Sequence, residues 1–371
     1  MKIVQILPEL NEGGVERGTM ELSREFVALG HESIVISCGG KLVSNIEADG
    51  GKHISLDVCS KNPLTALARI YKLRKVLKSL KPDIVHVRSR VPAWLTYFAN
   101  KSLKIPFVTT VHGLNSISSY SRIMTKGDRV ICVGEAVQEY IINGYALDNN
   151  DNRITTIQRG VDLSRFNILN IDKSFIKSFK EEHELENKYI VTSVGRITWL
   201  KDYETFIEAI AIAKLEIPNI IGLIVGGAGK GKIDYLNSLK RLVAQYNLED
   251  NIKFTGSQSK MPEIYFLSNI LVNASLKMGN VARTIIEALA LDTLVIATTY
   301  EGLNDIVVDG KNGAIIETKN AKQLANKIVE VKNNNYQNVS KTIPKEYTLD
   351  MMSESTLDVY KNLLNHKRDI K

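Results

Sequence analysis

Short apolar runs alternate with amphipathic segments along most of the chain, and this alternation limits the fold more than any other feature of the sequence. The clearest strand candidates are KIVQIL, DIVHV, FVTTV, YIVTSVG, IGLIVG and TLVIAT. Many of the strand candidates are apolar without alternation, which is typical of parallel strands covered on both faces. Strand, helix and strand in series require right-handed crossover connections. The pattern therefore predicts an α/β protein built from parallel sheets.

The alternation occurs in two series, separated by a polar and charged segment at 163–188 that has no strand pattern. A chain of 371 residues is also longer than one ordinary domain. We therefore expect two Rossmann-like doubly wound domains, at residues 1–165 and 166–348, followed by a helical segment at 349–371.

Composition and cysteine spacing exclude several other classes of protein. The chain is 44% hydrophobic and 24% charged, which excludes a disordered, collagenous or coiled-coil protein. No apolar run approaches the ~18 residues that span a bilayer, and the first one ends at Pro8, too early for a secretory signal. Cys38, Cys59 and Cys132 lie far apart without a C-x-x-C motif. We therefore expect no disulfide framework, no cysteine zinc site and a cytoplasmic location.

Positive charge is concentrated in the first half of the chain. Residues 1–165 hold 22 Lys and Arg against 16 Asp and Glu, whereas the remainder holds 26 against 25. The densest segment, 61–81, has seven cations and no acid, and its apolar residues from Leu64 onward have a helical spacing that predicts a core-facing side. The cations favour an anionic partner such as a membrane surface, although a solvated helix face gives the same pattern. Few aromatic residues interrupt the segment, which argues against nucleic acid.

Three segments that follow strand candidates carry possible ligand-binding residues. They are NEGGVERG with Gly13 and Gly14, TVHG with His112, and VGRITWLKD with Arg196 and Lys201. Ligands of open α/β sheets bind beyond the carboxyl ends of the strands. Glycines let a helix start approach an anion, and two cations can clamp a diphosphate. The simpler interpretations are a tight turn, a structural histidine and a solvated loop.

Two further segments need a separate interpretation. The glycine cluster at 226–231 is not a P-loop, because Lys230 is followed by Gly231 rather than by Ser or Thr. The helical segment 282–290 carries Glu287, whose carboxylate can bind ribose hydroxyls as acidic groups do in dinucleotide sites. A solvated glutamate is the alternative for Glu287.

Taken together, the motifs resemble the retaining glycosyltransferases of family four, which have the GT-B architecture of two Rossmann-like lobes. The matching segments, in the order of the family, are GGVERG with ALGHE, DIVHVRSR, TVHG, RGVDLSRF, VGRITWLKD, IIEALA and VDGKNGAII. They cover most of residues 1–317. The forms at 88–94 and 282–288 look most like bacterial enzymes that build lipopolysaccharide core or O-antigen.

The resemblance implies a nucleotide-sugar donor in the second lobe, an acceptor in the first, and a last helix that returns to the first lobe. It also assigns roles to individual residues. Those matched to the donor diphosphate are Gly14, Arg196, Lys201, Arg283 and Thr284, the last two at a helix start. His112 matches the residue that contacts the donor sugar, and Glu287 the second glutamate of an E-x7-E motif that holds the ribose.

Two positions depart from the family pattern. In the family, the first glutamate of E-x7-E contacts donor-sugar hydroxyls, and in this chain Gly279 stands in its place. Glu301 replaces the first glycine of a pair that is common in the family. Gly279 leaves the identity of the sugar open and favours, as an alternative, a non-catalytic sugar-nucleotide binder. A nucleotide-sugar epimerase is a further alternative.

The resulting expectation is a hexosyl-type glycosyltransferase of lipopolysaccharide or other cell-surface polysaccharide synthesis. The acceptor is expected to be a glycan or glycolipid, and the location cytoplasmic or peripheral on the inner face of the cytoplasmic membrane. No D-x-D motif occurs in the sequence, so we expect neither a metal nor a cofactor, with Arg196 and Lys201 supplying the positive charge. No nucleic-acid partner is expected.

Overall fold

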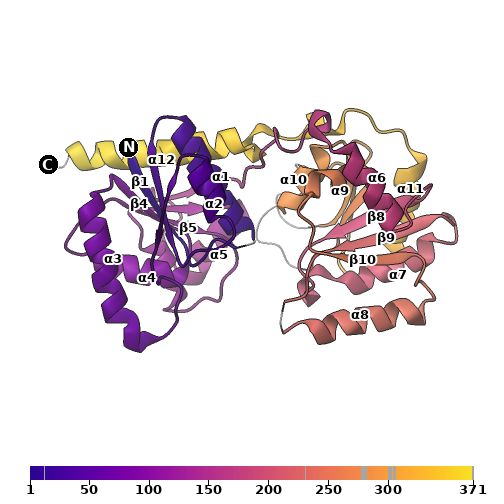
Figure 1. Cartoon of the computed structure of the whole chain (residues 1–371), viewed down its shortest axis with the longest axis horizontal. Helices are drawn as coiled ribbons and strands as arrows, with labels where there is room; N and C mark the ends of the chain where they lie inside the picture. The colour runs from indigo at the N-terminus through magenta and orange to yellow at the C-terminus, as the bar shows by residue number, and fades with distance from the viewer. Residues whose placement is uncertain (12, 230, 277–281, 300–302, 304–305, 370–371) are drawn as a thin grey trace. The chain divides into compact units, whose positions relative to one another are not determined.

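The chain forms two compact units, each of which contains one parallel sheet (Figure 1). The computed structural model describes residues 1–371 except 12, 230, 277–281, 300–302, 304–305 and 370–371. The first unit comprises Met1–Asp162 with Lys345–Lys371, and the second comprises Leu163–Pro344. The predicted α/β fold with two Rossmann-like domains is confirmed.

The first unit has a seven-stranded sheet in the order β3-β2-β1-β4-β5-β6-β7. Its strands are β1 (Lys2–Ile6), β2 (Glu32–Ser37), β3 (Lys52–Ser55), β4 (Ile84–Val87), β5 (Phe107–Val111), β6 (Arg129–Cys132) and β7 (Ile154–Thr156). Its helices are α1 (Gly14–Ala28), α2 (Val43–Ala48), α3 (Ala66–Leu80), α4 (Arg90–Asn100), α5 (Glu135–Tyr145) and α12 (Leu349–Asp369). All strand pairs are parallel, so the carboxyl ends of the strands share one edge.

Both faces of the first sheet are covered, which explains why its strands are apolar without alternation. In β1, Val4 belongs to a buried cluster with Leu73 of α3, whereas the neighbouring Ile3 belongs to a cluster with Phe26 of α1. Successive side chains of a strand point to opposite faces. Helices on both sides therefore favour apolar residues at successive positions, and the buried polar exceptions, such as Gln5 and His86, are hydrogen-bonded.

Helix α12 follows the second unit in sequence but packs in the first. Its Tyr360 is fully buried, and the rings of Tyr360 and Phe26 of α1 meet edge to face with centroids 5.9 Å apart. The hydroxyl of Tyr360 also hydrogen-bonds Nδ1 of His86 in β4 at 2.5 Å. The chain re-enters the first unit at a parallel bridge between Val161 and Thr348.

The second unit has a six-stranded parallel sheet in the order β10-β9-β8-β11-β12-β13. Its strands are β8 (Tyr189–Val194), β9 (Ile220–Val225), β10 (Ile252–Gly256), β11 (Ile270–Asn273), β12 (Leu294–Thr298) and β13 (Gly313–Ile316). Its helices are α6 (Lys173–Glu182), α7 (Tyr203–Ala213), α8 (Ile233–Gln245), α9 (Met261–Leu267), α10 (Arg283–Leu289) and α11 (Ala321–Asn333). Val191 and Ile190 of β8 lie in separate buried clusters, so this sheet is also covered on both faces.

The start of the basic segment does not face a core, which corrects the prediction for Leu64 and Leu67. These leucines are 90% and 81% exposed, and the buried apolar residues of α3 are Leu73 and Leu77. Leu64 lies in the 3-10 turn Pro63–Thr65 that precedes α3, and Leu67 lies in the first turn of α3, before the first buried residue of the helix. Among the described residues, no helix combines the length and the apolar character that crossing a membrane requires.

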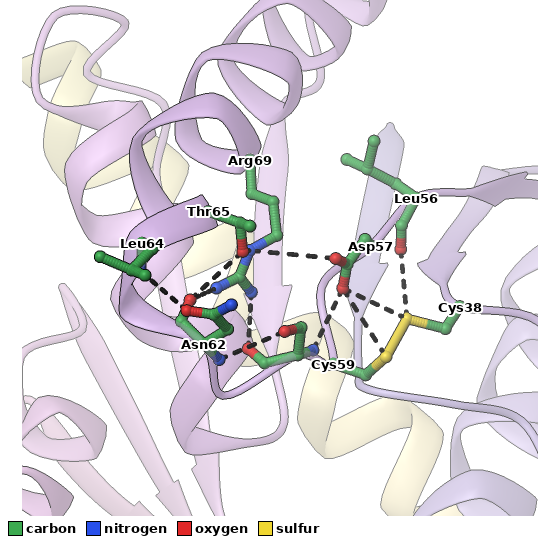
Figure 2. Close-up of polar contacts among 9 residues, drawn as sticks. Cys38, Leu56, Asp57, Cys59, Asn62, Leu64, Thr65 and Arg69 are labelled. Atoms are coloured by element: carbon green, nitrogen blue, oxygen red, sulfur yellow. Dashed lines mark hydrogen bonds and ion pairs between the residues drawn. A yellow bond between two sulfur atoms is a disulfide. The ribbon is translucent and has the colours of Figure 1, made fainter.

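Cys38 and Cys59 form a disulfide, which the expectation of no disulfide framework did not include (Figure 2). The residues are separated by 21 positions in sequence, but they follow the neighbouring strands β2 and β3, and their Cα atoms lie 6.3 Å apart. Asp57 Oδ1 lies 3.9 Å from Cys38 Sγ and 3.8 Å from Cys59 Sγ. Cys132 is free and buried.

Candidate functional site

The loop after β8 carries two cations at the carboxyl edge of the second sheet. Arg196 is exposed, and the half-buried Lys201 folds back so that its Nζ donates to Ser275 Oγ at 3.3 Å. Ser275 follows β11, which pairs with β8, so Lys201 connects the ends of two adjacent strands. Gly195 makes room for this side chain, because a Cβ atom there would lie 2.6 Å from Lys201 Cε.

Among the described residues, no carboxylate neutralises the charge of Lys201. Neither Lys201 nor Arg196 forms an ion pair within the part of the chain that the structure describes. Burial lowers the pKa of Lys201, and the neighbouring Arg196 lowers it further. Two cations at a strand end, without a carboxylate partner in the described part of the chain, form an arrangement that can bind a diphosphate.

Glu287 in α10 is held by two partners, which rules out a solvated glutamate. The residue is 8% exposed, and its Oε2 accepts a hydrogen bond from the hydroxyl of Tyr265 in α9 at 2.9 Å. Nε of Arg283, one turn earlier in α10, lies 3.6 Å from its other oxygen. The hydroxyl of Thr284 is buried and has no hydrogen-bond partner among the described residues. Tyr265, which fixes the carboxylate, was not identified from the sequence.

Gly279, which replaces the first glutamate of the family motif, lies outside the described residues, as does Glu301.

In the first unit, Gly14 starts α1 and lies against Arg159. A Cβ atom at Gly14 would collide with the guanidinium group of Arg159, so a glycine is needed for this approach. Arg159 follows β7, and its position beside the helix start was not predicted. The structure therefore adds a cation to the glycine loop that the sequence indicated.

His112 follows β5 and differs from the structural histidine of the same sheet. His86 uses both ring nitrogens, since Nδ1 bonds Tyr360 and Nε2 lies 2.6 Å from Thr110 Oγ1. Both ring nitrogens of His112 are buried without a hydrogen-bond partner in the described part of the chain. Burial lowers the pKa of His112 well below its ordinary value, and nearby cations lower it further. A neutral imidazole with both nitrogens unused can donate one hydrogen bond and accept another.

Two family profiles match the chain in sequence. The family described as Glycosyltransferase Family 4 matches residues 12–165, and the family described as Glycosyl transferases group 1 matches residues 174–346. Arg196, Lys201 and Glu287 lie in the second match, whereas Gly14 and His112 lie in the first.

Solved structures and curated proteins agree with these matches. The crystal structure of a glycosyltransferase from Rickettsia africae ESF-5 is 31% identical, covers 98% of both chains and has a TM-score of 0.85. An Anabaena protein, Alr3699/HepE, solved in complex with UDP and glucose, has a TM-score of 0.83 at 17% identity over 97% of this chain and 99% of that one, which shows a shared fold.

The UDP-Gal:alpha-D-GlcNAc-diphosphoundecaprenol alpha-1,3-galactosyltransferase of Escherichia coli is 27% identical over 91% of this chain and 88% of that protein. An uncharacterised glycosyltransferase of Methanocaldococcus jannaschii is 29% identical, but the match spans only 58% of this chain and 53% of that protein.

Proposed function

Because the chain belongs to the glycosyltransferases, we propose that it transfers a hexose-like sugar from a nucleotide-diphosphate sugar to a glycan or glycolipid acceptor. The second unit binds the donor and the first binds the acceptor. The observation that carries this proposal is the uncompensated pair of cations, Arg196 and Lys201, at the end of β8.

The chemical problem in such a transfer is the departure of the nucleoside diphosphate. Negative charge grows on this group as the bond to the sugar breaks, and donors that are already in place stabilise it without reorganisation. Arg196 and Lys201 supply fixed positive charge of this kind, and Glu287 holds the ribose. The sequence has no D-x-D motif, which supports a metal-independent reaction.

His112 acts on the donor sugar as a neutral group. Its lowered pKa keeps the imidazole uncharged near neutral pH, so it acts through hydrogen bonds, one donated and one accepted, and one of these holds a sugar hydroxyl. Retention of the anomeric configuration follows from the family resemblance. The named acceptor of the E. coli relative is a sugar carried by diphosphoundecaprenol. This supports a lipid-linked acceptor and a role in lipopolysaccharide or another cell-surface polysaccharide.

The test is release of nucleotide from a panel of sugar nucleotides, measured with and without an extract that contains lipid-linked glycans. We expect acceptor-dependent release with at least one donor, and a loss of at least ~10²-fold in Arg196→Ala and Lys201→Ala. Lys240→Ala, an exposed lysine of α8, is the matched control. Near wild-type turnover of both Arg196→Ala and Lys201→Ala at saturating donor would contradict the role of these cations in binding the diphosphate.

The exposed end of α3 supports a membrane surface as the second partner. Leu64, in the turn before α3, is 90% exposed, and Leu67 and Tyr71 of α3 are 81% and 69% exposed. Lys72 and Lys75 are exposed on the same helix. Apolar side chains beside cations are typical of helices that lie on anionic lipid. Arg74 is not free for this role, since its guanidinium donates to the carbonyl groups of Phe98 and Ala99.

Co-sedimentation with vesicles tests the membrane proposal. Binding to phosphatidylcholine vesicles that contain phosphatidylglycerol should weaken at high salt, since each cation contributes about 1 kcal/mol near an anionic surface. It should also weaken when Lys72 and Lys75 become Gln. Changing the exposed Lys101 and Lys104 to Gln is the control for net charge. Binding that is absent, or that does not respond to salt, would refute this partner.

A further inference from the structure

The first unit contains two equally buried arginines whose surroundings differ. Arg69 and Arg88 are each 6% exposed. The guanidinium of Arg69 donates to the carbonyl groups of Ser60 and Asn62 at 2.6 and 2.7 Å, and its Nε lies 4.0 Å from an oxygen of Asp57 (Figure 2). Arg69 is therefore satisfied by its own surroundings.

Arg88 has no such set of partners. It follows β4, and its Nε donates to the neutral amide oxygen of Gln5 in β1 at 3.1 Å. Its Nη2 is buried with no hydrogen-bond partner, and no carboxylate pairs with Arg88 among the described residues. An unpaired buried charge costs several kcal/mol, so a residue of this kind is expected where an anion completes the site. Burial lowers the pKa of Arg88 to about 10, so the group is charged at neutral pH.

His112 supplies a second unsatisfied group at the same sheet edge. β4 and β5 are adjacent parallel strands, with Val87 opposite Thr109, so Arg88 and His112 both follow strands that end side by side. Burial lowers the pKa of His112, and the positive charges of Arg88 and Arg159 lower it further. A Cβ atom added at the next residue, Gly113, would meet no atom within 4 Å, so there is open space beside His112.

We propose that Arg88 and His112 together bind a phosphate oxyanion in the first unit. Arg88 provides the charge and two N–H donors in a planar fork, and His112 donates one further hydrogen bond. This site is separate in sequence and in unit from the pair Arg196 and Lys201, which belongs to the second unit. The origin of the phosphate rests on the proposed function, in which the first unit binds the acceptor: it belongs to the acceptor, as a phosphate-linked glycan.

The test measures binding rather than catalysis. Inorganic pyrophosphate is titrated by calorimetry into the full chain that carries Arg196→Ala and Lys201→Ala. These substitutions remove the two cations of the second unit that are proposed to bind a diphosphate. We expect binding to persist in this background and Arg88→Met to weaken it at least tenfold. Arg88→Lys should retain part of the affinity, because it keeps the charge but loses the fork.

Arg90→Gln is the matched control, since Arg90 lies two residues away but is occupied by Ser121 at 3.0 Å and by the ring of Tyr120. It should bind pyrophosphate as the parent does. The thermal midpoint of Arg88→Met without ligand should equal or exceed that of the parent, because the substitution removes an unpaired buried charge.

Two results would overturn the proposal. One is pyrophosphate affinity that is unchanged in both Arg88→Met and His112→Ala. The other is a folded parent whose Arg88→Met and Arg88→Lys variants both fail to fold, which would make Arg88 a structural residue.

The source of the phosphate is decided on the chain with Arg196 and Lys201 intact. A selective loss of geranyl diphosphate binding in Arg88→Met supports an acceptor phosphate, and a selective loss of UDP binding refutes it. Failure of sugar transfer with intact pyrophosphate binding would instead refute the proposed function alone.

Discussion

Lys201→Met separates a catalytic role from a structural one, because the two roles predict opposite effects on stability. The substitution keeps the aliphatic stem that packs against Gly195 and removes only the charge. Loss of one preorganised donor to a developing oxyanion costs about 2.7–4 kcal/mol, or ~10²–10³ in turnover. The partner that Lys201 has in the described structure is a neutral hydroxyl, Ser275, at 3.3 Å, so the folded chain loses one weak hydrogen bond.

The pH dependence of stability has a definite sign for this residue. The pKa of Lys201 is lowered in the folded chain, first by burial and then by Arg196. Between the folded pKa and the ordinary lysine value, the unfolded chain binds more protons, so this residue makes stability rise with pH in that interval. At neutral pH the charge therefore opposes folding, and Lys201→Met should be as stable as the parent or more stable.

The assay combines turnover at saturating donor with urea unfolding at neutral and alkaline pH, and Lys240→Met is the control for removal of an exposed lysine. We expect a large loss of turnover, no loss of stability, and a smaller rise of stability with pH than in the parent. A variant that loses at least ~2 kcal/mol of unfolding free energy together with its activity would refute the reasoning, because that magnitude is typical of a broken buried interaction.

Four further outcomes are expected. Turnover should survive EDTA; full loss with recovery by Mg²⁺ or Mn²⁺ would show that a metal is required. Replacing Cys38 and Cys59 by Ser should lower the free energy of unfolding by about 3 kcal/mol, since the cross-link joins residues 21 apart; equal urea midpoints for oxidised and reduced protein would contradict this. Gly195→Ala should reduce turnover by displacing the side chain of Lys201, with unchanged donor KM and kcat as the opposing result. Gly279→Glu should shift preference among sugar nucleotides; an inert parent beside an active variant would mean that the natural chain has lost catalysis.

The strands were predictable because burial on both faces leaves a local signal. Ile3 and Val4 are neighbours in sequence and enter different clusters, so both must be apolar, and an apolar run records this requirement. Helical periodicity is also local, but it cannot show how far a helix extends past its sheet. For this reason Leu64 and Leu67 were assigned to a core although they are exposed.

Contacts between distant segments leave no comparable signal. Cys38 and Cys59 are paired because β2 and β3 are neighbours in the sheet, and strand order is not encoded in the spacing of two residues. The candidate site shows the same limit. Lys201 was identifiable because it follows a strand, whereas Tyr265, which fixes Glu287, comes from a different helix. Its role depends on the packing of α9 against α10.

The return of α12 to the first unit has a consequence for biosynthesis. His86 and Tyr360 are 274 residues apart, and the whole second unit is translated between them. While residues 163–344 emerge from the ribosome, Ile3 of β1 and Phe26 of α1 are not yet covered by α12, and Nδ1 of His86 lacks its partner Tyr360. Domains usually fold in the order of synthesis. In this chain the second unit, which is continuous in sequence, can finish folding before the first.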